Sequence, residues 1–277
     1  MRTLLVLTDF SEAATHAAKY AAIFAKQMMA TKIILFNKLQ SITQIPNTPE
    51  RLAATRQNKE DALRHLKQLT NELKFLKHTH TQVDYLVNEG QLDQLTNELI
   101  SKYQVDYVVM GLTGKSKLEQ TLIGSNTIKI AKTVIKPLLI VPLSSRLNPI
   151  SKIVSILNLL DLKQAKTVNH LLYPLRMHHQ FELTVLYHEN ESHPQKSLHN
   201  HHLTAVREQL APYQPDYFAI SEINIVQDVL DFCILHHGSL IIHIEKKRNF
   251  FESLFSTDIT EEMAYVSHIP VLLAKQA

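Results

Sequence analysis

The sequence contains little glycine and almost no cysteine. A single cysteine, Cys233, excludes an intrachain disulfide and a cysteine-based metal cluster. No apolar run approaches the ~20 residues that a membrane-spanning helix needs. Only a short apolar run precedes Asp9, and it is too short for a signal peptide. We therefore expect a cytoplasmic protein with no membrane partner.

The sequence also has no large excess of positive over negative side chains, or of negative over positive ones. The formal net charge is +3, and the lysines and arginines are dispersed without a basic run that contains interleaved aromatics, so we expect no nucleic-acid partner. Histidine is more concentrated, at residues 193, 199, 201 and 202, but this segment has no carboxylate or cysteine at a matching spacing. We expect a solvated face there and no metal site.

Short apolar runs alternate with amphipathic helical stretches along the first half of the chain. The expected strands cover residues 3–8, 33–36, 83–87, 107–110 and 138–141. The expected helices cover residues 11–29, 50–76, 91–103 and 125–134. This alternation indicates βαβ units, and continuous apolar strands are typical of a parallel sheet covered on both faces.

The same pattern restarts after a polar, turn-prone linker at residues 143–149. The expected strands are 153–157, 182–187, 217–220, 240–244 and 271–273, and the expected helices are 162–177, 196–210, 225–235 and 259–266. Pro137 and Pro270 lie 133 residues apart, and the same offset places residues 107–110 on 240–243. A gap-free match of this kind predicts an α/β protein with two duplicated domains, 1–143 and 150–277.

Glycine is concentrated at one place. Three of the five glycines, Gly111, Gly114 and Gly124, fall within fourteen residues directly after an expected strand. Glycine lets backbone N–H groups approach a ligand, and the N-terminus of the following helix carries unpaired N–H groups and a partial positive charge. This arrangement favours phosphate binding. The alternative is that these glycines only form turns and a helix cap.

Neighbouring side chains add to the candidate phosphate site. Ser125 is a suitable N-cap, and its hydroxyl and that of Thr127 are potential donors, with Asn126 between them in the same turn. Lys115 is a candidate partner for the outer phosphates, as a loosely held point charge.

A carboxylate is expected at the same edge of the sheet. Asp9 follows the first strand, and the first and fourth strands flank the point where the order of an open parallel sheet reverses. There Asp9 does not favour phosphate, but it can accept hydrogen bonds from a sugar or a base. The alternative is that Asp9 only caps the next helix.

These features together resemble the universal stress protein family. The resemblance rests on TDFSEAA at residues 8–14, on the spacing G-x2-G-x9-G-S and on the apolar strand after Lys136-Pro137. It covers residues 1–142 closely, with a weaker copy over 150–275. It implies two Rossmann-like, open twisted parallel five-stranded sheets of order 3-2-1-4-5, with helices on both faces.

The resemblance also implies a ligand, ATP with or without Mg²⁺. Asp9 would lie by the adenosine, and Gly111, Gly114, Gly124 and Ser125 would surround the phosphates. Lys38 stands at the adenine-contacting position, where the family more often has a small apolar residue. Family members also pair through their fifth strands, which predicts contact between residues 138–141 and 271–273 or self-association.

The second copy lacks the phosphate-binding residues. At the offset of 133, the positions of Gly111, Gly114, Gly124 and Ser125 carry Ile244, Lys247, Thr257 and Asp258. The counterpart of Asp9 is Leu159 or, after a one-residue slip, Asn158. We therefore expect a degenerate second domain.

The sequence predicts an ATP-binding protein of stress response or signalling that is not an enzyme. Two alternatives stay open. One is a nucleotide-independent interaction scaffold with an unknown protein partner. The other is a slow ATPase, for which no water-orienting base or metal ligand beyond Asp9 is identified.

Overall fold

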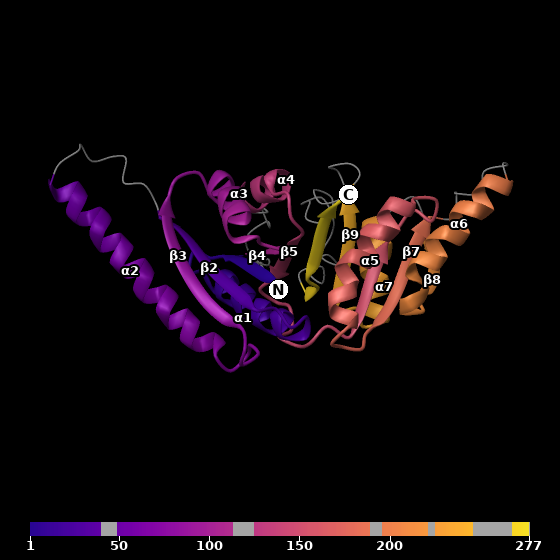
Figure 1. The fold of residues 1–277 in the computed structure, drawn as a ribbon, viewed down its shortest axis with the longest axis horizontal. Coiled ribbons are helices and arrows are strands. Elements are labelled where there is room, and N and C mark those ends of the chain that lie inside the picture. The colour runs from indigo at the N-terminus through magenta and orange to yellow at the C-terminus, as the bar shows by residue number, and fades with distance from the viewer. Residues whose placement is uncertain (40–48, 113–124, 189–195, 221–224, 246–267, 277) are drawn as a thin grey trace. The chain divides into compact units, whose positions relative to one another are not determined.

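A computed structural model describes residues 1–39, 49–112, 125–188, 196–220, 225–245 and 268–276 (Figure 1). The chain divides into two compact units. Of the described residues, 1–112 and 125–143 belong to the first unit and 144–276 to the second.

The first unit is built on a parallel sheet with the order β3-β2-β1-β4-β5, as predicted. Its strands are β1 (Thr3–Leu7), β2 (Lys32–Leu39), β3 (Gln82–Glu89), β4 (Tyr107–Leu112) and β5 (Leu138–Pro142). Its helices are α1 (Glu12–Gln27), α2 (Pro49–Leu73), α3 (Leu92–Tyr103) and α4 (Ser125–Thr133). Right-handed crossovers place α1 and α2 together on one face and α3 and α4 on the other.

Helix α1 packs tightly on the sheet because its inner face is almost entirely alanine. Ser11 begins the helix as its N-cap, with its Oγ accepting a hydrogen bond from the Ala14 N–H at 3.2 Å. The buried alanines of this face are Ala13, Ala14, Ala17, Ala18, Ala21, Ala22 and Ala25. Small side chains let the helix axis lie close to the strands, and all five residues of β1 beneath it are buried.

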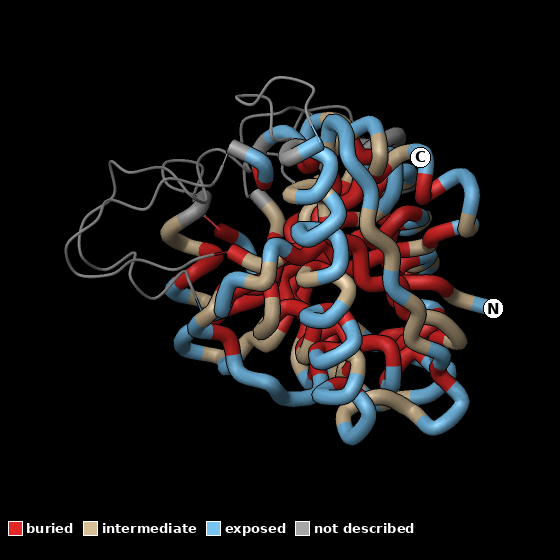
Figure 2. The backbone as a smooth tube through the Cα atoms, turned by 90° about the vertical axis from the view of Figure 1, so that its left-hand side faces the viewer, coloured by how far each residue is buried: buried red, intermediate tan, exposed pale blue. Residues whose placement is uncertain are grey.

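Helix α2 is attached to the sheet by its C-terminal half. Ala62, Leu66, Leu69 and Leu73 are buried at helical spacing against β2 and β3. Leu52, near the start of the helix, is 66% exposed. Figure 2, viewed from the α2 side, shows the largely exposed outer helix in front of the buried strands.

The second unit has the equivalent order β8-β7-β6-β9-β10, again all parallel. Its strands are β6 (Lys152–Ile156), β7 (Glu182–His188), β8 (Asp216–Ile220), β9 (Leu240–Glu245) and β10 (Val271–Lys275). Its helices are α5 (Leu162–Arg176), α6 (Lys196–Leu210) and α7 (Ile225–Leu235). A 3₁₀ turn at Ala211–Tyr213 was not predicted, and the expected helix 259–266 lies outside the described residues.

Strand register relates the two units residue by residue. Val108 is in register with Leu138, and Ile241 with Val271, so both members of the pair shift by 133. Leu4 is in register with Tyr107 and Ile153 with Leu240, so equivalent positions in the first strands of the two units differ in residue number by 153 − 4 = 149. Adding 149 to 9 gives 158. The structure therefore decides between the two predicted counterparts of Asp9 in favour of Asn158.

Within the described part of the chain, no helix combines the length and the apolar character needed to cross a membrane.

The uneven attachment of α2 gives a first prediction. Leu66 is fully buried, so Leu66→Ala should lower the free energy of unfolding by about 2–5 kcal/mol, through lost burial and an unfilled cavity. Leu52→Ala, the same change on the same helix, should alter it by less than about 0.5 kcal/mol. Urea unfolding followed by circular dichroism measures both values. Equal losses in the two variants would contradict this account of α2.

Candidate functional site

The candidate site lies at the carboxyl edge of the first sheet, where β1 and β4 are neighbours. The two strands are in register from Leu4–Tyr107 to Val6–Val109. The strand order reverses between them, because the chain adds β2 and β3 on one side and β5 on the other. In open α/β sheets the crevice at this reversal is the usual ligand site.

The turn after β1 holds Asp9 at this edge. Thr8 Oγ1 accepts a hydrogen bond from the Phe10 N–H at 3.1 Å, and Asp9 Oδ1 accepts one from the Ser11 N–H at 3.0 Å. Phe10 has a φ of 67°, a left-handed conformation that is uncommon for a residue with a bulky side chain. Its ring lies 5.1 Å from that of His65 on α2.

This geometry bears on the two interpretations of Asp9. The N-cap of α1 is Ser11, so helix capping does not account for the Asp9 carboxylate. Asp9 is exposed, and among the described residues no cation lies within ion-pair distance of it. Its carboxylate is therefore available to accept hydrogen bonds from ligand hydroxyl or amino groups.

The end of β2 is fixed to the same turn. Buried Asn37 donates from Nδ2 to the Thr8 carbonyl at 2.8 Å, and the Thr8 N–H donates to the Phe36 carbonyl at 2.9 Å. Lys38 follows as a half-buried residue, and it lies inside β2 rather than after it. One ammonium group thus belongs to the same edge as Asp9.

Gly111 lies within β4, in register with Val141 of β5. A Cβ at this position would lie 2.3 Å from the Ala13 carbonyl oxygen and 2.8 Å from the Ala14 nitrogen. Glycine is therefore required here because the first turn of α1 touches the strand. The sequence predicts a strand that ends at residue 110, with Gly111 just after it. Its position inside the strand instead brings the α1 N-terminus against β4 beside Asp9.

Helix α4 presents its N-terminus to this edge, because it follows β4 and returns to the start of β5. Asn126 in its first turn is exposed, whereas Thr127 is only 4% exposed and lies on the inner face. Burial leaves the Thr127 hydroxyl poorly placed to meet a ligand. Gly114, Lys115 and Gly124 lie outside the described residues, as does the side chain of Ser125.

An ion pair that the sequence did not reveal orients α4. Lys129 Nζ of α4 lies 2.8 Å from Asp93 Oδ1 of α3, and Asn97 Nδ2 donates to the Thr133 carbonyl at 3.3 Å. The hydrogen bond from Lys129 lowers the pKa of the Asp93 carboxyl. Because the two residues are 36 positions apart on different helices, no local spacing rule predicts this pair.

The corresponding edge of the second unit has different chemistry. Asn158 Oδ1 accepts from the Leu160 N–H at 2.7 Å, which repeats the Asp9 turn with an uncharged side chain. Ile244, which is 1% exposed, stands in place of Gly111. Gln276 Nε2 lies 2.9 Å from both carboxylate oxygens of Asp161, the N-cap of α5. Lys247, Thr257 and Asp258 lie outside the described residues.

In the described part of the chain, no three His, Cys, Asp or Glu side chains gather as potential metal ligands. Of the histidine cluster, only His202 has a described side chain, and it is exposed.

Known proteins share both sequence features and the fold of this chain. The sequence model of the universal stress protein family matches residues 1–142. A universal stress protein from Archaeoglobus fulgidus is 13% identical, with 99% of this chain and 98% of that chain covered and a TM-score of 0.71. A functionally unknown protein from Pseudomonas aeruginosa is 12% identical, with 100% and 93% covered and a TM-score of 0.56. These two likenesses show the fold.

A shorter match is to a universal stress protein in complex with cAMP. It is 22% identical, with 50% of this chain and 95% of that chain covered and a TM-score of 0.37. No curated protein matches the sequence.

The close contact at Gly111 gives a second prediction. Gly111→Ala should lower the free energy of unfolding by about 3 kcal/mol, because the new methyl group meets backbone atoms of α1 that cannot move alone. Gly238→Ala is the matched control. Its Cβ would meet side-chain atoms of Cys233 and Val154 at 3.1–3.2 Å, which can shift, so a smaller loss is expected. Urea unfolding compares the two, and an unchanged Gly111→Ala protein would contradict the packing account.

The Asp93–Lys129 pair gives a third prediction, on pH. Because the folded-state pKa of Asp93 is lowered, the ionised carboxylate contributes fully to the free energy of unfolding at pH values above the ordinary carboxyl pKa, about 4. That contribution is lost as the pH falls through the lower folded value. Asp93→Asn should therefore be less stable than wild type at neutral pH, and the difference should shrink in acid.

The matched control for this prediction is Asp61→Asn. Asp61 pairs with Arg64 at 2.8 Å on the surface of α2, where an ion pair contributes little. Urea unfolding at a series of pH values should show almost no pH-dependent difference for this control. A constant Asp93→Asn deficit at every pH would contradict the electrostatic explanation.

Proposed function

The chain belongs to the universal stress protein family, and from this premise we propose that its first unit binds ATP, with or without Mg²⁺, at the carboxyl edge of the sheet. We propose further that the protein acts in stress response or signalling through the bound nucleotide rather than as an enzyme. Adenine nucleotide is the small-molecule partner in this proposal.

The observation that carries the proposal is the position of the Asp9 carboxylate. It is exposed, it is not used to cap α1, and it lies where the strand order reverses. A ribose hydroxyl is a natural donor to such a carboxylate. The N-terminus of α4 belongs to the same edge and supplies the positive potential that a phosphate chain needs, away from Asp9.

The differences at the second edge support an asymmetric protein. Asn158 replaces the carboxylate, and Ile244 places a buried side chain where the first unit has only backbone. Asp161 at the start of α5 also accepts hydrogen bonds from Gln276 at that edge. We therefore propose one ATP per chain, bound by the first unit.

One observation favours a second candidate function. The contact with Ala13 accounts for Gly111 without any ligand, so one of the three clustered glycines is explained by packing alone. This favours the nucleotide-independent interaction scaffold more than the sequence did. A slow ATPase is the weakest candidate, since the described residues add no group that would orient a water for attack.

Calorimetric titration of the full chain with ATP, with and without Mg²⁺, tests the proposal. One saturable site per chain is expected. Asp9→Asn should weaken binding by roughly tenfold, as expected for losing a hydrogen bond to a charged acceptor. Gly124→Val should abolish binding by filling the phosphate space, while a thermal melt shows a folded protein.

Thr257→Val is the matched control, because Thr257 is the sequence counterpart of Gly124 in the second copy. It should leave affinity and stoichiometry unchanged. Two sites per chain would contradict the asymmetry. Wild-type affinity in folded Gly124→Val would contradict the assignment of the phosphates to the glycine segment. No binding by the wild-type chain would contradict the ATP proposal and favour the scaffold.

A further inference from the structure

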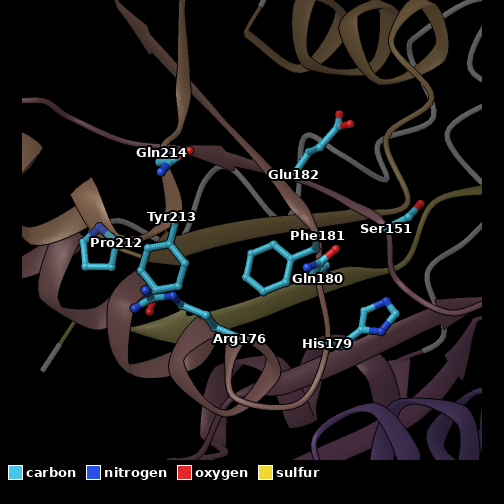
Figure 3. A pocket seen from close by; sticks show the side chains of 9 residues that line it. All are labelled: Ser151, Arg176, His179, Gln180, Phe181, Glu182, Pro212, Tyr213 and Gln214. Atoms are coloured by element: carbon cyan, nitrogen blue, oxygen red, sulfur yellow. The ribbon is translucent and has the colours of Figure 1, made fainter.

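The second unit has a pocket of about 610 Å³ at the amino-terminal edge of its sheet, opposite to the edge that corresponds to the candidate ATP site. It lies where α5 ends, β7 begins and the 3₁₀ turn Ala211–Tyr213 follows α6. Figure 3 shows the Tyr213 and Phe181 rings next to each other, with the Arg176 guanidinium close to Tyr213 and His179 beyond Phe181. The pocket is therefore lined by both aromatic and cationic groups.

Two aromatic rings form one wall of this pocket. Phe181 and Tyr213 are stacked, with centroids 6.0 Å apart and an interplanar angle of 26°. Tyr213 is 9% exposed, and its hydroxyl donates to the Asn169 carbonyl of α5 at 3.1 Å. Burial raises the pKa of Tyr213 to about 12, so the hydroxyl stays protonated at neutral pH. Tyr213 is thus fixed in place beside Phe181, and half-buried Phe181 offers an apolar ring surface that suits a planar ligand.

The charged side chains that line the pocket are the Arg176 guanidinium and the Glu182 carboxylate. Arg176 Cζ lies 5.6 Å from the centroid of the Tyr213 ring, and Arg176 is exposed with no carboxylate partner among the described residues. The acid that lines the pocket, Glu182, pairs instead with Lys152 at 3.3 Å. The guanidinium, oriented by the ring, keeps its N–H groups available for a planar anion. Half-buried His179 adds a further hydrogen-bonding group.

The corresponding corner of the first unit has different side chains. Strand β7 is the counterpart of β2, and Ile34 of β2 is in register with Asp84, as Thr184 of β7 is with Asp216. Residue numbers near the third strand of each unit therefore differ by 216 − 84 = 132, which makes Thr81 the counterpart of Tyr213. Thr81 is 2% exposed and its Oγ1 donates to the Ala30 carbonyl at 2.8 Å. Lys77 Nζ donates to the Thr81 carbonyl at 2.6 Å. Tyr213 of the pocket therefore has a buried threonine as its counterpart, and the aromatic lining is not a general feature of this fold.

We propose that this pocket binds a small aromatic anion, with its ring against Phe181 and its carboxylate or phosphate on Arg176, the guanidinium that Tyr213 orients. The ring gains contact with an aromatic wall, and the anion gains a guanidinium that no described carboxylate neutralises. This site is independent of the ATP site, because it belongs to the other unit and to the opposite edge of its sheet. It assigns the second unit a ligand of its own.

Titration of the full chain with benzoate and with phenyl phosphate, followed by NMR, tests the proposal. Saturable binding of at least one of them is expected, and the tighter of the two identifies the anionic group. Benzamide lacks the charge and cyclohexanecarboxylate lacks the aromatic ring, so each should bind at least several-fold more weakly. Absence of saturable binding by both anions would overturn the proposal.

Arg176→Gln should weaken binding of the better probe by about tenfold, as expected for losing charge-assisted hydrogen bonds. Arg176→Lys should restore part of the affinity, because it keeps the charge without the planar fork. Arg146→Gln, the same change at an exposed arginine of the same unit outside the pocket, should have no effect. Phe181→Leu should weaken the aromatic probes without changing the weak binding of cyclohexanecarboxylate.

Thermal melts of each variant establish that the second unit stays folded. Wild-type affinity in both Arg176→Gln and Phe181→Leu would place the bound probe elsewhere and overturn the assignment. An equal loss in Arg146→Gln would show a non-specific charge effect and would also overturn it. ATP titration of the same variants should give wild-type values, which separates failure of this inference from failure of the proposed ATP site.

Discussion

The backbone of α1 touches the backbone of β4 at Gly111, and the geometry of the first unit's candidate site depends on this contact. The contact sets how closely the alanine face of α1 approaches the sheet. It also places the turn that contains Asp9 beside the end of β4, because Asp9 lies only four residues before Ala13, the first touching residue. A single missing side chain therefore links the packing of the core to the arrangement of the ligand edge.

The second unit lacks this constraint, and its packing and its edges differ accordingly. Its strands repeat the order and the register of the first unit, yet Ile244 occupies the contact position and α5 packs less extensively on β9. Its carboxyl edge carries Asn158 and the Asp161–Gln276 interaction in place of a free carboxylate. The pocket lined by Arg176 and Phe181 lies at its opposite edge. Two sheets of one topology thus differ in the side chains that lie at their carboxyl and amino edges.

The sequence alone was sufficient to derive most of the architecture. Apolar strands alternating with amphipathic helices have distinct periods, so β1, α1, α5 and the offset of 133 between β4–β5 and β9–β10 could all be predicted. The family match over residues 1–142 confirms the resemblance carried by TDFSEAA and the glycine spacing. Local signals of this kind depend only on neighbouring residues, and they survive without knowledge of distant contacts.

Only the tertiary structure decided the details that control the edges of the sheets. In the structure, Gly111 lies inside β4 rather than after it, and Thr127 is buried. Strand register identifies Asn158, not Leu159, as the counterpart of Asp9, and Asp93 forms an ion pair with Lys129. The tertiary structure also brought Arg176, Phe181 and Tyr213 together from three separate segments. The physical reason is common to all of these. Each depends on which residues meet across the chain, and sequence spacing determines such contacts only within a single helix or strand.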